Sequence, residues 1–399
     1  MPRGFRAAGT TCGIKPSGRP DLTLIISDSP CSAAGVFTTN RCLGAPVVIG
    51  KRHLRRGLAR AIVCNSGIAN VATGAIGLRH ALAMCEYVAR RVDCAVSDVL
   101  PCSTGLIGPR LPIDRIGRGI GAAVKKLARG AEADAEAASA ILTTDLVSKQ
   151  SLHHLRLGPK TGTITRLGGI AKGSGMIAPN MATMLCFITT DAAIVPAALR
   201  AAVKEAVKCT FNRISVDNDT STSDAVLVLA NGAAGGTPIT GPGRKHNIFV
   251  AALINLCEDL ALQIVRDGEG AKKVMRVHVE RAATQRDADR VGRAIVNSPL
   301  VKTALHGGDP NWGRLIMAVG KSGARVVPQR LSVTIADVTI FARGAPVALR
   351  STTLRKLTRG MRRNQVVFQV DLGLADAHAK WLGCDLSKQY VTINAEYTT

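Results

Sequence analysis

The strongest candidate for chemistry is a threonine at an abrupt change in the character of the chain. Thr183 follows the glycine-rich, proline-broken segment KGSGMIAPNMA at 172–182 and opens the apolar run TMLCF. A threonine hydroxyl is a weak nucleophile unless a base removes its proton, and the residue's own free α-amine can be that base. Cleavage between Ala182 and Thr183 would create such an amine, with an ordinary pKa of about 8. The alternative is that Thr183 only begins a β-strand, because the pattern ATMLCFITT is typical of one.

Several segments spread along the chain, the one around Thr183 among them, form a wider pattern. They are GVFTTN at 35–40, NSG at 65–67, STGLIG at 103–108, TTD at 143–145, KGSGMIAPNMATML at 172–185, DGEGA at 267–271, GGDPNWGR at 307–314 and the terminal INAEYTT. In this order they resemble the bifunctional ornithine acetyltransferase and glutamate N-acetyltransferase family of arginine biosynthesis. The resemblance spans essentially the whole chain, and its segments around Thr183 and Asp309 are long enough to be specific.

The resemblance implies a reaction. Members of this family cleave themselves before the threonine, which then carries the acetyl group in a ping-pong transfer from N2-acetyl-L-ornithine to L-glutamate. By resemblance, residues 1–182 become an α chain and residues 183–399 a β chain, interleaved in one fold and paired as an α2β2 heterotetramer. No cofactor is implied, although acetyl-CoA is a conceivable second acetyl donor.

The resemblance also implies which residues act. The family's oxyanion hole matches the Thr104 hydroxyl and the Gly105 backbone N–H, and two such donors supply about 3 kcal/mol each to a developing oxyanion. The family's substrate contacts match six positions, namely Thr143, Lys172, Thr183, Glu269, Asn394 and Thr399. A lysine and a glutamate suit the carboxylate and the ammonium group of an amino acid.

Each of these residues also has a plainer interpretation. Lys172 would ordinarily be a solvated surface lysine, and Glu269 would be loop charge. Thr104 with Gly105 would ordinarily form a turn. Asn394 and Thr399 would belong to an edge strand and a frayed tail.

The chain departs from the usual family pattern near several of these segments. The departures are Ile68, Val71 and Ala72 in NSGIANVATG, Leu146 and Ser148 in TTDLVSK, and Ser223 in DTSTSD. None falls on a residue assigned to the site. An apolar Ile68 and a Ser148 could still change pocket polarity or loop rigidity, so they bear on substrate preference rather than on acetyl transfer.

Composition is that of a globular enzyme. The chain has 399 residues, 46% of them hydrophobic, so it can bury a large core and is expected to form two lobes. Its uninterrupted apolar runs are far shorter than the 18 residues or so of a membrane span, and its first residues lack an apolar targeting segment, so we expect a cytoplasmic protein with no membrane partner.

The chain contains no pattern typical of a metal or a nucleotide cofactor. Its 11 cysteines include no C-x-x-C pair and are expected to be reduced. His153 and His154 would point to opposite faces of a strand. The segment GSGMIA at 173–178 lacks the helix that a dinucleotide needs, and the segment beginning at Asp217 lacks the glycine and glutamate of a calcium loop. We therefore expect no metal site.

The charge balance raises one further alternative. Lysine and arginine number 52 against 28 aspartates and glutamates, a net charge of +24, which a nucleic-acid-binding protein would also show. The excess is spread over both halves, and aromatic residues make up only 3% of the chain, too few for base stacking. We expect no specific nucleic-acid partner. A self-processing amidohydrolase or aminopeptidase, in which water resolves the acyl-enzyme, is the alternative enzyme.

Hydrophobic periodicity predicts the elements that must position these residues. Strands are expected at 22–27, 45–49, 61–64, 163–170, 181–190, 225–230, 274–280, 314–319, 331–342, 366–371 and 389–395. Helices are expected at 76–92, 112–128, 131–142, 196–208, 247–266, 285–297 and 351–362. The predicted fold is therefore α/β, with mixed sheets layered with helices in two lobes. The resemblance makes it the self-processing, N-terminal-threonine-nucleophile type of the ornithine acetyltransferases.

Overall fold

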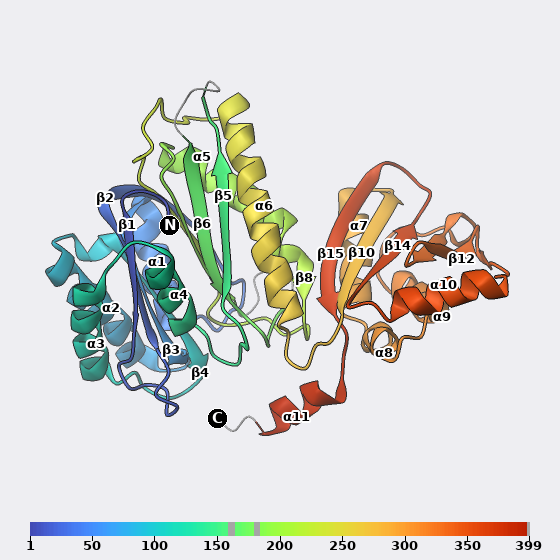
Figure 1. Ribbon diagram of the computed structural model, residues 1–399, viewed down its shortest axis with the longest axis horizontal. Helices are drawn as coiled ribbons and strands as arrows, with labels where there is room; N and C mark the ends of the chain where they lie inside the picture. The colour runs from blue at the N-terminus through green and yellow to red at the C-terminus, as the bar shows by residue number, and fades with distance from the viewer. Residues whose placement is uncertain (159–163, 179–183, 397–399) are drawn as a thin grey trace.

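Apolar strands build the larger lobe around one mixed sheet (Figure 1). The computed structural model describes residues 1–158, 164–178 and 184–396. The sheet has the order β4-β3-β2-β9-β7-β6-β5, and β1 pairs with β2. The strands are β1 (Phe5–Thr10), β2 (Leu22–Phe37), β3 (Leu58–Ile68), β4 (Val99–Leu106), β5 (Lys149–Leu155), β6 (Thr165–Lys172), β7 (Leu185–Thr190) and β9 (Ala225–Ala230). Among the strands of this sheet that the structure describes, the β3–β4 and β7–β9 pairs are parallel and the other pairs are antiparallel.

This strand order brings together parts of the chain that are distant in sequence. Strand β9 lies between β2 and β7, and β7 pairs with β6 in an antiparallel register in which Lys172 is opposite Leu185. The last residue of β6 and the first residue of β7 are therefore neighbours, although twelve residues separate them in the sequence. Lys172, one of the assigned residues, lies at this end of the sheet.

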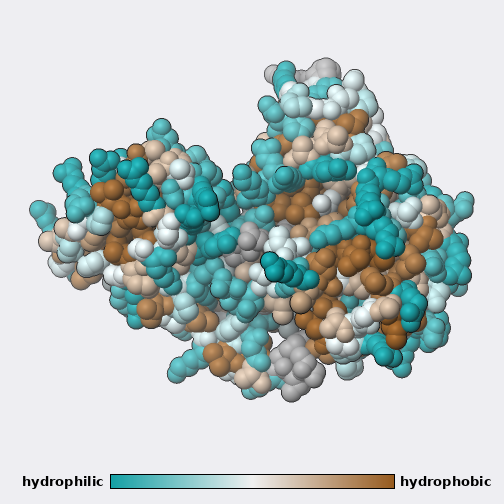
Figure 2. All heavy atoms as spheres, turned by 180° about the vertical axis from the view of Figure 1, so that it is seen from behind, coloured by the Kyte–Doolittle hydropathy of each residue, from teal (hydrophilic) through white to brown (hydrophobic). Residues whose placement is uncertain are grey.

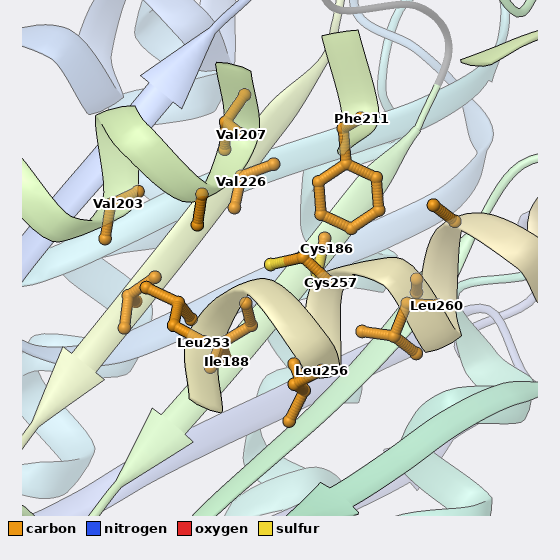
Figure 3. Close-up of a cluster of buried hydrophobic side chains, with 14 of the residues drawn as sticks. Cys186, Ile188, Val203, Val207, Phe211, Val226, Leu253, Leu256, Cys257 and Leu260 are labelled. Atoms are coloured by element: carbon orange, nitrogen blue, oxygen red, sulfur yellow. The ribbon is translucent and has the colours of Figure 1, made fainter. Parts of the chain in front are cut away.

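Six helices cover the two faces of the sheet. They are α1 (Ala45–His53), α2 (Gly74–Val92), α3 (Ile113–Lys126), α4 (Ala131–Ala140), α5 (Pro196–Cys209) and α6 (Arg244–Arg266). Helices α5 and α6 pack together on one face, where Val203, Val207 and Leu256 meet Cys186 and Val226 of the sheet (Figure 3). All five side chains are buried, so this layer is a dry core that fixes β7 and β9 beneath the helices.

The smaller lobe is a second sheet with its own core. Its order is β13-β12-β11-β14-β10-β15-β8. The strands are β8 (Ile214–Ser215), β10 (Val274–Ala282), β11 (Ser332–Ile335), β12 (Val338–Ala342), β13 (Ala345–Pro346), β14 (Gln365–Asp371) and β15 (Ala377–Cys384). Its helices are α7 (Gln285–Val296), α8 (Pro299–Gly307), α9 (Trp312–Gly320) and α10 (Ser351–Met361). Strand β8 follows helix α5 and its short 3-10 turn Phe211–Arg213, so this pairing joins the two lobes.

The chain ends its described part in helix α11 (Lys388–Glu396), which lies apart from the second sheet (Figure 1). None of its residues is buried. Seen from behind, the two lobes adjoin, and hydrophobic side chains gather over the larger one (Figure 2).

Helix α6 is long and apolar enough to cross a membrane when judged by length and composition alone. Half of its most apolar window is nevertheless buried, and Phe249, Leu253, Leu256 and Leu260 pack into the core against α5 and the sheet. These contacts make α6 a core helix of the larger lobe.

The predicted α/β architecture of mixed sheets, helices and two lobes is confirmed, but three predicted strands are wrong. Residues 45–49, 314–319 and 389–395 lie in helices α1, α9 and α11. A short apolar run is compatible with a helix or a strand, and the residues at its start determine which one forms. Pro46 occupies the first turn of α1, and the Asn311 side chain accepts a hydrogen bond from the Arg314 backbone at the start of α9.

Gly292 supplies a test of the second core. A Cβ at this position in α7 would lie 2.1 Å from Cδ1 of the buried Trp381, so Gly292→Ala should lower the free energy of unfolding by about 1–3 kcal/mol. Gly320→Ala is the matched control, because a Cβ there meets nothing within 4 Å. Urea unfolding should show a lower midpoint for Gly292→Ala only; equal midpoints would contradict this packing.

Candidate active site

Lys172 is the centre of the site. It is the last residue of β6, and its side chain is only 2% exposed. Its Nζ donates to Oγ1 of Thr143 at 2.7 Å and to Oγ1 of Thr104 at 3.4 Å. Three residues expected from separate segments are therefore in contact. The interpretation of Lys172 as a solvated surface lysine is wrong, because the fold buries it among hydroxyls.

Gly105 lies beside Thr104 on β4, in a place that only glycine can fill. Its φ is +124°, in the range that L side chains avoid, and a Cβ there would lie 2.3 Å from the carbonyl carbon of Gly67. Gly67 is its partner in the parallel register of β3 and β4. The NSG and STG segments are thus side by side, and Thr104 and Gly105 belong to a strand rather than to a turn.

Lys172 belongs to a buried network of ion pairs. Lys149 Nζ lies 2.7 Å from Oδ1 of Asp145 and 2.6 Å from Oδ2 of Asp267, and Lys172 Nζ lies 3.8 Å from Oδ2 of Asp145. All four side chains are at most 5% exposed. Two ammonium groups and two carboxylates compensate one another, which removes the large cost of an unpaired buried charge.

Asp145 is the connecting member of this network. Its oxygens also accept hydrogen bonds from the backbone N–H of Gly173 at 2.6 Å and of Thr143 at 3.0 Å. Burial alone would raise its pKa, but the charges of Lys172 and Lys149 and these hydrogen bonds hold the pKa below its usual range. Asp145 therefore remains a carboxylate.

Sequence reasoning did not single out Asp145, Lys149 or Asp267. Asp145 and Asp267 stand within the TTD and DGEGA segments, beside residues that were assigned. The four-residue spacing of Asp145 and Lys149 was a further signal, but it is common on any surface. Nothing in the sequence connects Lys149 with Asp267, 118 residues away.

Glu269 and Asn394 form a second group. Asn394 Nδ2 donates to Oε2 of Glu269 at 2.9 Å, and Glu269 N donates to the carbonyl of Ser174 at 3.0 Å. A Cβ on Gly175 would lie 2.4 Å from the Glu269 carboxyl carbon, so this carboxylate rests directly on the segment that follows Lys172. The edge-strand interpretation of Asn394 is wrong, since it lies on helix α11.

Three of the assigned residues, Ala182, Thr183 and Thr399, lie outside the described residues. The described residues on either side of 179–183 are held by carboxylates from one segment. Asp217 accepts from the N–H groups of Met176 at 2.6 Å and Ile177 at 2.8 Å, and Asp224 accepts from the N–H of Met184 at 2.8 Å.

A cavity of about 950 Å³ opens beside the Lys172 group. Gly105, Thr143 and Asp145 form part of its wall. Three of the residues that depart from the usual family pattern, Ile68, Leu146 and Ser148, line it as well. These departures therefore lie on the wall of the cavity.

No group of three or more metal-ligating side chains gathers anywhere in the described residues. His153 pairs with Asp259 at 2.7 Å instead. The 11 cysteines are all free thiols, and burial raises the pKa of Cys64, Cys102 and Cys186 above the usual thiol value. Hydroxyl, ammonium and carboxylate groups, rather than thiols or a cluster of metal ligands, are therefore the chemical groups found at and beside this cavity in the described residues.

The site therefore combines a buried ammonium group, two threonine hydroxyls and a close-packed glycine beside a cavity, within an α/β fold. The chain matches the ArgJ family over residues 6–399 and belongs to it. It is 46% identical to the arginine biosynthesis bifunctional protein ArgJ of Symbiobacterium thermophilum, over all of this chain and 98% of that protein. It is 44% identical to the protein of the same name from a Synechococcus species, over all of this chain and 96% of that one.

The similarity extends to solved structures. The crystal structure of the ArgJ protein from Bacillus halodurans matches with a TM-score of 0.51 and 40% identity, covering 53% of this chain and 98% of that one. The expected family is thus confirmed, and with it acetyl transfer in arginine biosynthesis as the reaction class.

Asp145 supplies a test of the network. Asp145→Asn leaves Lys172 without a carboxylate and should lower the free energy of unfolding by about 3–5 kcal/mol, the usual cost of breaking a buried ion pair. Exposed Asp376 gives the matched control, because Asp376→Asn removes the same charge from the surface. Urea midpoints that shift equally for both variants would rule out the network as a stabilising element.

The raised pKa of Asp217 predicts how the free energy of unfolding should depend on pH. Burial raises its pKa to about 6, against the backbone hydrogen bonds that lower it. Between pH 4 and pH 6, roughly, the folded chain holds a proton that the unfolded chain has released, so stability falls as pH rises through this window. Asp217→Asn should flatten that decline in urea midpoints measured from pH 4 to 7, whereas Asp376→Asn should keep it. A wild-type midpoint that rises across the window would reverse the assigned sign.

Proposed function

We propose that this chain is a self-cleaving acetyltransferase that moves an acetyl group from N2-acetyl-L-ornithine to L-glutamate through an acetyl ester on Thr183. One observation carries the proposal. A buried ammonium group, that of Lys172, donates to the hydroxyls of Thr104 and Thr143 beside a cavity, at the end of β6 from which the chain runs toward Thr183.

Thr104 and Gly105 are proposed as the oxyanion hole. Because Lys172 donates to Oγ1 of Thr104, the hydroxyl proton of Thr104 remains available to a developing oxyanion. The Gly105 backbone can come close to the same point because it has no Cβ. Donors held in a buried site need no rearrangement when charge develops, which is why such donors lower the barrier.

The reaction would proceed in two steps, acetylation of Thr183 and transfer of the acetyl group to glutamate. The Thr183 hydroxyl oxygen attacks the acetyl carbonyl carbon, and the Thr183 α-amine takes the hydroxyl proton and passes it to the departing amine of ornithine. The C–N bond breaks and the acetyl ester remains. The unprotonated amine of glutamate then attacks the ester carbonyl carbon, and the ester C–O bond breaks to release N-acetylglutamate. The proton of the attacking amine returns through the α-amine to the Thr183 oxygen, which restores the hydroxyl.

Substrate recognition is proposed for Thr143, Lys172, Glu269 and Asn394, together with Thr183 and Thr399. Lys172 supplies a cation and Glu269 a carboxylate. Thr143, which contacts Lys172, and Asn394, which contacts Glu269, supply neutral polar groups. An amino acid carries a carboxylate and an ammonium group, so this pairing of signs suits it.

Self-cleavage between Ala182 and Thr183 is proposed to give interleaved α and β chains. The strand order supports this, since β7 and β9 of the second part are hydrogen-bonded within a sheet built by the first part. The matched Bacillus halodurans chain has about half the length of this one, which is the size expected of one product. An α2β2 assembly in the cytoplasm and acetyl-CoA as a second donor complete the proposal.

Thr183→Ala tests both cleavage and transfer. On denaturing electrophoresis the wild type should give fragments of 182 and 217 residues, and the variant should give one intact band. Transfer from N-acetylornithine to glutamate should fall at least a thousandfold, by about 4 kcal/mol in the barrier. Thr303→Ala, an exposed threonine in the second lobe, should leave both unchanged. Retained transfer in Thr183→Ala would exclude this nucleophile, and acetate release without N-acetylglutamate would indicate the hydrolase.

A further inference from the structure

The cavity beside the acetyl-transfer site has a second, cationic end. Besides Gly105 and Thr143, its wall includes Lys15 and Arg19 from the loop between β1 and β2. None of the residues assigned to the reaction lies on this loop. The cavity, at about 950 Å³, is at the upper end of the range for pockets that hold drug-sized ligands, and an acetylated amino acid fills much less.

This loop is held rigidly by one buried carboxylate. Asp21 is fully buried, and its oxygens accept from the N–H groups of Cys12 at 2.6 Å, Ile14 at 2.6 Å and Lys15 at 3.1 Å. Gly18 N donates back to the carbonyl of Lys15 at 3.1 Å. The loop is therefore preorganised, and its shape does not depend on a ligand.

The loop is also fitted to the oxyanion end of the site. Ile14 packs against Gly67, whose missing Cβ would lie 2.7 Å from Ile14 Cγ2. Gly67 in turn packs against Gly105. The position of Lys15 is thus fixed relative to Gly105 through a short chain of close contacts.

Lys15 and Arg19 take part in no ion pair that the described part of the chain shows. Neither forms an ion pair with a carboxylate within 4 Å among the described residues, and the one hydrogen bond that Lys15 Nζ donates goes to the carbonyl of Pro20 at 2.7 Å. Lys15 is half-buried, and burial lowers its pKa, although Asp21 and Asp145 act in the opposite direction. A half-buried ammonium group with unused donors is best satisfied by an anion from outside the chain.

We propose that Lys15 and Arg19 form an anion subsite of this cavity, which binds an anionic oxygen group of the acetyl donor or acceptor while its reacting end lies at Gly105. Two sources share this chemistry: the carboxylates of the amino-acid substrates and the phosphates of an acyl-CoA. The inference rests on the proposed function for the identity of these substrates, but not for the existence of the subsite.

Kinetics of Lys15→Met and Arg19→Gln separate the two sources. If the KM for acetyl-CoA rises about tenfold or more and the KM values for the amino-acid substrates do not change, the subsite binds phosphate. If the KM values for the amino-acid substrates rise by that factor and the KM for acetyl-CoA does not change, the subsite binds carboxylate. In either case kcat should stay within about twofold, since neither residue touches the reacting atoms. Lys15→Arg should recover most of the loss. Lys126→Met and Arg118→Gln on helix α3 are the matched controls.

Binding measured without turnover keeps this test independent of the proposed reaction. Glutamate and coenzyme A are titrated separately into the wild type and the Lys15→Met variant by calorimetry. Weaker binding of either ligand to the variant supports the subsite even if the wild type transfers no acetyl group. Unchanged affinity for both ligands, together with unchanged KM values, would overturn the inference.

Discussion

The site depends on the mutual compensation of buried ammonium and carboxylate groups in a region from which water is excluded. Lys172 is buried at the end of β6, and an unpaired ammonium group there would destabilise the fold. Asp145 prevents this, because it faces Lys172 and Lys149 together and is itself held by backbone N–H groups. Asp267 then balances Lys149. The same network joins three segments that no local contact would bring together, so the position of Lys172 is set by electrostatic compensation as much as by packing.

Glycine makes the complementary contribution on the other side of the lysine. Gly67 and Gly105 touch backbone to backbone where β3 and β4 pair, and this contact leaves the Thr104 hydroxyl beside Lys172. Gly175 provides the space in which the Glu269 carboxylate rests. A cation, a carboxylate and two hydroxyls can therefore surround one short stretch of chain without steric conflict. Such an arrangement suits a reaction whose barrier is lowered by donors that are already in place.

Much of this architecture could be predicted from residue patterns, and the misses have physical causes. The longer helices were predicted because their apolar residues recur with a helical period over many turns. Residues 45–49 and 314–319 were mistaken for strands because five or six apolar residues look alike in either element, and Pro46 and Asn311 decide between them only through helix-start geometry. Asn394 was misplaced for a related reason, since an exposed helix leaves no periodic apolar face to detect.

The sequence by itself determined the family, the acetyl-transfer chemistry and the residues that approach one another around Lys172. These follow from specific segments that occur along the chain in the same order as in the family. Only the tertiary structure showed why Lys172 is tolerated there, since its supporting partners Lys149 and Asp267 are ordinary charged residues until the fold buries them together. The cationic end of the cavity at Lys15 was likewise decided by the fold. Burial and the ion pairs that a side chain forms among the described residues are properties of three-dimensional neighbours, and a residue's type and spacing do not contain them.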